Sequence, residues 1–109
     1  MTDCKICVDA GVCKMKTTIT AKTNDMGLVE LDIKSDCPKV LKMSWGLEPM
    51  SPYAEVEAKF SESTIYKLAD NTIPHTACPV PGAMVKALEV AGDIGLKRDV
   101  SIRFIDDDE

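Results

Sequence analysis

The chain has 109 residues, of which 45% are hydrophobic, and a formal net charge of −5. This size and composition predict one domain with a modest core and argue against disorder. Acidic residues outnumber basic ones by 18 to 13 and no Lys/Arg cluster occurs, which argues against nucleic-acid binding. No apolar run approaches the roughly 20 residues of a membrane helix, and no signal-peptide pattern begins the chain, so no membrane association and a cytoplasmic location are expected.

The N-terminal part predicts an irregular arm followed by a β-hairpin. Residues 1–12 show no periodicity and are expected to form the arm. Residues 13–22 and 28–35 each alternate between apolar and polar side chains, with turn-forming residues between them. This period of two predicts two half-buried strands that pair as a hairpin over residues 13–35.

The register of this hairpin brings two cysteines together. If the turn centres near Asp25, opposed residues have numbers that sum to about 50, which places Cys13 opposite Cys37. Directly opposed Cβ atoms in a sheet lie about 5 Å apart. We therefore expect the two cysteines to meet at the open end of the hairpin.

Three to four helices are expected after the hairpin. Pro38 suits the first turn of a helix, because its missing N–H has no intrahelical partner there. Residues 50–60 favour a short helix, and Ser61 is expected to cap a helix of about ten residues. Pro79 then opens the last helix, which Gly92 ends.

The C-terminal part completes the expected fold. Residues 99–105 alternate once more between apolar and polar side chains, which predicts a third strand. Residues 106–109 form an acidic tail to which no function is assigned. The sum is an α+β fold, a single two-layer domain over residues 13–105 in which a three-stranded sheet carries the helices on one face.

Five cysteines in 109 residues favour metal binding or redox chemistry over structural disulfides in a reducing compartment. Cys37 and Cys78 each stand before a proline at a predicted helix start, where the helix dipole favours the thiolate. Thiolate is the form that binds metals. The hairpin adds Cys13 to this pair, although small cysteines filling the end of the core are an alternative interpretation.

A structural zinc site typically has four ligands, either four cysteines or three cysteines and a histidine. His75, the only histidine, can complete a set with the three convergent cysteines, or it is a loop residue that hydrogen-bonds nearby. Cys4 or Cys7, from the Cys-x-x-Cys of the arm, can instead fold back as the fourth ligand. An iron–sulfur cluster would also accept these sulfur ligands.

The segment Asp36-Cys37-Pro38, followed later by His75-Thr76-Ala77-Cys78-Pro79-Val80-Pro81, resembles a group of small uncharacterised prokaryotic proteins, mostly from anaerobes. The resemblance covers roughly residues 11–105. The layout is also similar to the cysteine-bearing TSCPD domain at the ends of some ribonucleotide reductases, which has Ser-Cys-Pro-Asp where this chain has Ala77-Cys78-Pro79-Val80. The resemblance implies a cysteine site linked to a metal and names no reaction.

Three functions are therefore open. The first is a binding module that holds zinc or an iron–sulfur cluster. The second is a small interaction or structural protein with core cysteines and no cofactor, and the third is a thiol redox protein in which Cys78 or Cys37 attacks. The usual hydrolase and phosphate-loop motifs are absent, which favours a role other than catalysis. The sequence allows a protein partner or a homo-oligomer and identifies neither.

Overall fold

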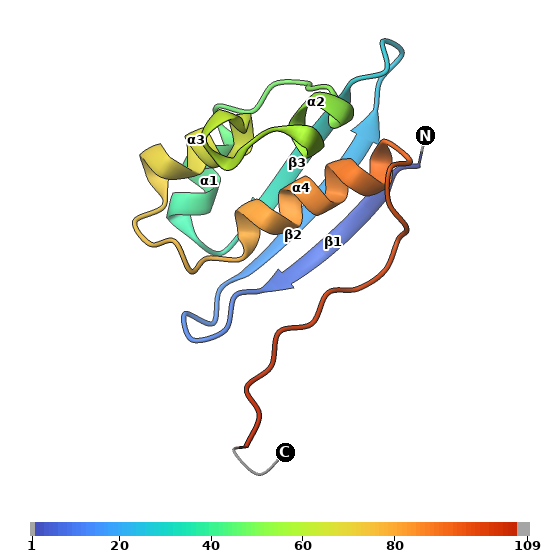
Figure 1. The fold of residues 1–109 in the computed structure, drawn as a ribbon. Helices are drawn as coiled ribbons and strands as arrows, with labels where there is room; N and C mark the ends of the chain where they lie inside the picture. Colours follow the sequence, from blue (N-terminus) through green and yellow to red (C-terminus); the bar gives the residue numbers. More distant parts are fainter. Residues whose placement is uncertain (1, 107–109) are drawn as a thin grey trace.

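The computed structural model describes residues 2–106 as a three-stranded antiparallel sheet and four α-helices (Figure 1). The predicted two-layer α+β class is confirmed. The strands are β1 (Cys4–Asp9), β2 (Lys16–Thr23) and β3 (Val29–Ser35). The helices are α1 (Pro38–Ser44), α2 (Pro52–Glu57), α3 (Thr64–Thr72) and α4 (Val80–Ala91), and a 3-10 turn covers Phe60–Glu62.

The third strand of the sheet is β1, so two predictions about the ends of the domain are wrong. β1 pairs with β2 on the side away from β3, which gives the order β1-β2-β3. The expected irregular arm therefore contains a strand, and its alternation is obscured because apolar Cys7 lies on its exposed face. The expected strand over 99–105 is absent from the sheet. Of the predicted acidic tail, only Asp106 lies within the described residues.

The β2–β3 hairpin is confirmed, but its register differs by two residues from the prediction. Ile19 pairs with Ile33, and Thr23 pairs with Val29 next to the turn, so opposed residues have numbers that sum to 52 and not to 50. The turn centres on Met26 because Asn24 Oδ1 accepts the backbone N–H groups of Met26 and Leu28, at 2.9 and 3.1 Å. Cys13 consequently lies before β2 and not opposite Cys37.

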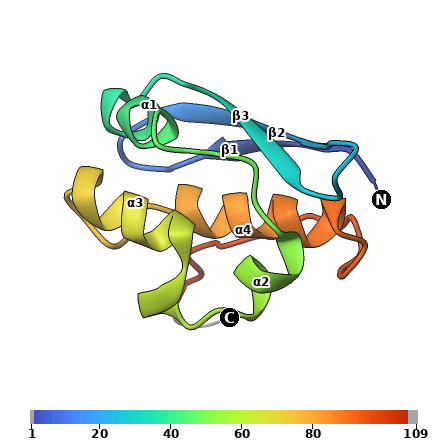
Figure 2. The same ribbon diagram turned by 90° about the horizontal axis from the view of Figure 1, so that it is seen from above.

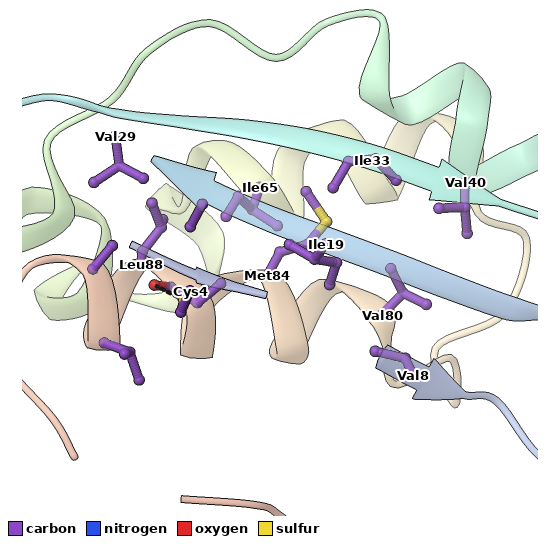
Figure 3. Close-up of a cluster of buried hydrophobic side chains, with 14 of the residues drawn as sticks. Cys4, Val8, Ile19, Val29, Ile33, Val40, Ile65, Val80, Met84 and Leu88 are labelled. Atoms are coloured by element: carbon purple, nitrogen blue, oxygen red, sulfur yellow. Dashed lines mark hydrogen bonds between the residues drawn. The ribbon is translucent and has the colours of Figure 1, made fainter. Parts of the chain in front are cut away.

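The core lies between the inner face of the sheet and the helices. Figure 2 shows α2, α3 and α4 on one side of the sheet, with α1 at one end of it. Ile19 of β2 and Met84 and Leu88 of α4 are fully buried (Figure 3). Burial of such a side chain contributes roughly 1.5–3 kcal/mol. None of the helices within residues 2–106 has the length and apolar character needed to span a bilayer.

The helix starts follow from their capping residues. Pro38 occupies the first turn of α1 with Cys37 at the N-cap, as predicted. Ser51 caps α2, and its hydroxyl accepts the N–H of Ala54. The cap of α3 is Ser63, because the chain first makes the 3-10 turn; the prediction of Ser61 is wrong.

Candidate functional site

A pocket of about 150 Å³ lies at the end of the sheet where β1 turns into β2 and where α1 and α4 begin. Three of the five cysteines and the only histidine line it. The remaining lining is mostly apolar. The lining residues are Ala10, Cys13, Met15, Thr17, Cys37, Lys39, Val40, Ile73, Pro74, His75, Cys78 and Val80.

The sheet holds Cys37 in place. Its backbone N–H donates to Ser35 Oγ at 3.0 Å, and Ser35 Oγ lies 2.7 Å from Thr17 Oγ1 on the neighbouring strand. The next residue back, Asp36, continues the strand pairing by donating its N–H to Lys16 O at 3.0 Å. The half-buried Cys37 side chain makes no capping hydrogen bond, so its sulfur is left to the pocket.

Cys78 reaches the pocket from the loop between α3 and α4. Pro79 is the N-cap of α4, and its carbonyl accepts the N–H of Ala83 at 3.1 Å. Pro79 therefore stands just before the first helical residue, Val80, and Cys78 directly precedes the cap. The Cys78 side chain is half-buried and contacts the edge of the core.

Cys13 and His75 are exposed residues at the rim of the pocket. Cys13 lies in the turn between β1 and β2, which requires positive φ values at Gly11 (91°) and Lys14 (60°). A glycine adopts such an angle without steric cost, whereas a lysine does so rarely. Cys13 thus comes to the same pocket as Cys37 through this turn and not through strand register.

Cys4 and Cys7 do not line the pocket, which corrects their prediction as a source of the fourth ligand. Residues three apart on a strand point to opposite faces. Cys4 is buried in the core (Figure 3), where its Sγ donates to Ala87 O at 3.5 Å, and burial raises the pKa of its thiol. Cys7 points to the exposed face of the sheet.

The pocket gathers candidate ligands without assembling them into a metal site. Zinc–sulfur bonds of about 2.3 Å place tetrahedral sulfur ligands about 3.8 Å apart. Within residues 2–106, no three His, Cys, Asp or Glu side chains lie close enough together to hold a metal ion. The prediction of zinc or an iron–sulfur cluster therefore stays a prediction.

The pocket also contains two residues that sequence reasoning missed. Lys39 adds a positive charge to a pocket lined by thiols, and Met15 adds a thioether to the thiols and the imidazole. The only sequence signal for Lys39 is its position after Cys37-Pro38. Thiols, an imidazole and an ammonium in a mostly apolar pocket can bind a soft metal ion or react with an electrophile.

A comparison with family models matches residues 4–104 to a family of unknown function (DUF6951). The match begins with β1 and extends beyond α4, so it includes the whole pocket. No curated protein and no solved structure shows a significant match to the chain.

Proposed function

The chain belongs to this family of unknown function, and we propose from its pocket that it is a small metal-binding protein. Zinc or an iron–sulfur cluster would be held through Cys13, Cys37 and Cys78. One observation carries the proposal: three of five cysteines and the single histidine line one small pocket. They come from three separate segments of the chain, so sequence proximity alone does not explain the grouping.

The chemistry of the pocket suits a thiolate-bound metal. Three thiolates around one Zn²⁺ carry a net charge of −1, which the ammonium of Lys39 would balance. His75 supplies a neutral nitrogen as the fourth ligand, the usual partner of three cysteines in structural zinc sites. The apolar side chains of Val40 and Ile73 limit the access of water, which strengthens the electrostatic attraction.

Metal binding on this proposal requires the pocket to close. Hydrogen bonds to the sheet fix Cys37, whereas Cys13 and His75 lie on turns at the rim. The turn and the loop would therefore move toward Cys37 and bring the ligands within bonding distance. Because a ligand that binds only the folded state stabilises it, the metal is expected to raise the free energy of unfolding.

Two further considerations support this function. The similarity to the TSCPD domain concerns a cysteine after an early strand and a Cys-Pro before a late helix, which here are the pocket residues Cys37 and Cys78. A reducing compartment such as the cytoplasm would keep these thiols available for a metal. On this proposal the protein is a binding module and not an enzyme.

The two alternatives make different demands on the same cysteines. In a thiol redox protein, Cys37 and Cys78 would each lose a proton and one electron to hydrogen peroxide, which forms a disulfide and two molecules of water. In a structural protein the cysteines would fill the core. Cys4 is buried and meets this requirement, whereas Cys7 and Cys13 are exposed and do not.

The test is the metal content of protein purified without oxygen or chelator, together with its absorption spectrum. About one zinc per chain with no visible band supports a zinc site, and iron with sulfide and a band near 400 nm supports a cluster. Cys78→Ser should abolish the metal, and Cys7→Ser, which removes an exposed thiol outside the pocket, should retain it. Metal content near zero in the wild type, or equal in both variants, would refute the proposal.

A further inference from the structure

Residues 99–105, after α4, alternate between polar and apolar side chains as a strand does, but they pair with no strand of the sheet. Residues 96–106 are exposed and leave the body of the domain (Figure 1), and Val100 and Ile102 are 67% and 85% exposed. Within the described residues, the last backbone hydrogen bond before this segment runs from Gly95 N–H to Glu89 O, at 3.1 Å. The family match extends to residue 104, so most of the segment belongs to the matched region.

Within residues 2–106, β1 is the edge of the sheet that is open along its whole length. At the β3 edge, Val29 and Met50 exchange two backbone hydrogen bonds of 2.8 and 3.0 Å, which occupy the start of that strand. At the other edge, β1 pairs only with β2, and no other segment within residues 2–106 forms a strand beside it. An uncovered edge presents unpaired N–H and C=O groups to any chain that can pair with them.

We propose that residues 99–105 of one copy of this chain pair with β1 of a second copy, in parallel orientation. Charge complementarity selects this arrangement. With β1 in parallel, Asp99 lies beside Lys5 and Arg103 beside Asp9, so that both pairs carry opposite charges. The antiparallel arrangement over the same residues places Asp99 beside Asp9 and Arg103 beside Lys5, and like charges opposite each other destabilise a sheet.

The apolar residues agree with the same register. Val100 then lies beside Ile6, and Ile102 beside Val8, all on the face of the sheet that packs against the helices. Ile6 is only half-buried in the single chain, so the added strand would cover it further. The pairing thus buries the apolar side chains that the single chain leaves in water.

The second copy is the occupant because the segment diverges from its own β1. It begins at the end of α4, where Thr2 N–H donates to Ala91 O at 3.2 Å, and then runs away from the sheet (Figure 1). Each copy contributes one segment and one β1 edge. A reciprocal exchange therefore forms two equivalent contacts and closes as a symmetric dimer.

A cysteine crosslink tests whether the segment pairs with β1 of a second copy. The parallel pairing places Ser101 beside Cys7, whose side chain is on the exposed face. Ser101→Cys is made in a protein whose Cys13, Cys37 and Cys78 are replaced by serine, and the oxidised product is examined by non-reducing electrophoresis and peptide mass spectrometry. Ile102→Cys, which points to the other face, is the matched control.

We expect a covalent dimer from Ser101→Cys, joined through Cys7, and little from Ile102→Cys. A disulfide within one chain would overturn the proposal, because the segment would then dock on its own β1. Absence of a disulfide, or equal crosslinking of both variants, would overturn it as well.

Light scattering of the wild type should give twice the chain mass of 11.9 kDa, and Ile102→Asp should weaken association at least about tenfold. Arg103→Asp tests the orientation, because it sets like charges beside Asp9 in the parallel arrangement and opposite charges beside Lys5 in the antiparallel one, so it should weaken association only if the strands are parallel.

Discussion

Two polar clusters in this domain contrast in how completely their groups are hydrogen-bonded. The buried Glu55 carboxylate accepts from the hydroxyl of Ser63 and from the backbone N–H groups of Thr64 and Ile65, at 3.1 and 3.0 Å for the latter two. It thereby ties α2 to the start of α3. Within residues 2–106, the sulfur atoms that line the pocket have no hydrogen-bond partner; these are Cys13, Cys37 and Cys78.

The difference separates groups that stabilise the fold from groups that are available to a ligand. A buried polar group that serves the fold must be hydrogen-bonded, because leaving it without a partner costs about 1–3 kcal/mol. Glu55 satisfies this requirement within the chain. The pocket thiols are weak hydrogen-bonding groups that lie at or near the surface, so the fold gains little from them. The following substitutions test this contrast.

Glu55→Ala is expected to have the largest effect. It leaves the Ser63 hydroxyl and two N–H groups without their acceptor, and should lower the free energy of unfolding by about 2–4 kcal/mol. Urea denaturation measures the loss. Glu57→Ala, at an exposed position of the same helix, should stay within about 0.5 kcal/mol of the wild type. A loss below about 1 kcal/mol for Glu55→Ala would contradict a structural role for this carboxylate.

Ser63→Ala should cost about 1 kcal/mol, because the hydroxyl both caps α3 and donates to Glu55. Ser61→Ala, two residues earlier and exposed, should change stability by less than about 0.5 kcal/mol. The same urea titration compares both variants. Equal losses would show that the start of α3 is not fixed by Ser63.

Cys78→Ser should alter the stability of metal-free protein by no more than about 0.5 kcal/mol, since its half-buried thiol has no hydrogen-bond partner within residues 2–106. With zinc present, the wild type should gain stability and the variant should not. Thermal denaturation with and without zinc measures both results. A large loss in the metal-free variant would assign Cys78 to the fold.

Cys4 should make a small contribution to the pH dependence of stability. Burial raises the pKa of its thiol in the folded state. The contribution of the Cys4 thiol to stability is therefore fully present below its pKa in the unfolded chain, about 8.5. It is lost as the pH rises through its pKa in the folded protein. Between pH 8 and pH 10, the wild type should lose more stability than Cys4→Ala, as measured by urea denaturation. Parallel pH profiles would contradict this assignment.

Local sequence patterns predicted much of the fold. Alternation gave the β2–β3 hairpin, and Pro38 placed the start of α1. The same alternation at residues 99–105 was misleading, because it shows how a segment would sit in a sheet but not which sheet it joins. The short strand β1 was missed because Cys7 makes its exposed face look apolar.

The site was predictable in part. The two Cys-Pro pairs led to Cys37 and Cys78, which line the same pocket. Cys13 joins them through the β1–β2 turn, whose conformation depends on positive φ angles that alternation does not encode. The prediction that Cys4 or Cys7 supplies a fourth ligand did not foresee that both lie on β1, where residues three apart point to opposite faces and Cys4 is buried in the core.

Mapping of alkylated cysteines with and without zinc tests most directly whether the pocket thiols form one ligand set. In metal-free native protein, we expect labelling of Cys7 and of the three pocket cysteines, while buried Cys4 reacts slowly. With one equivalent of zinc, only Cys7 should remain reactive. An unchanged labelling pattern on zinc addition would contradict the proposed site.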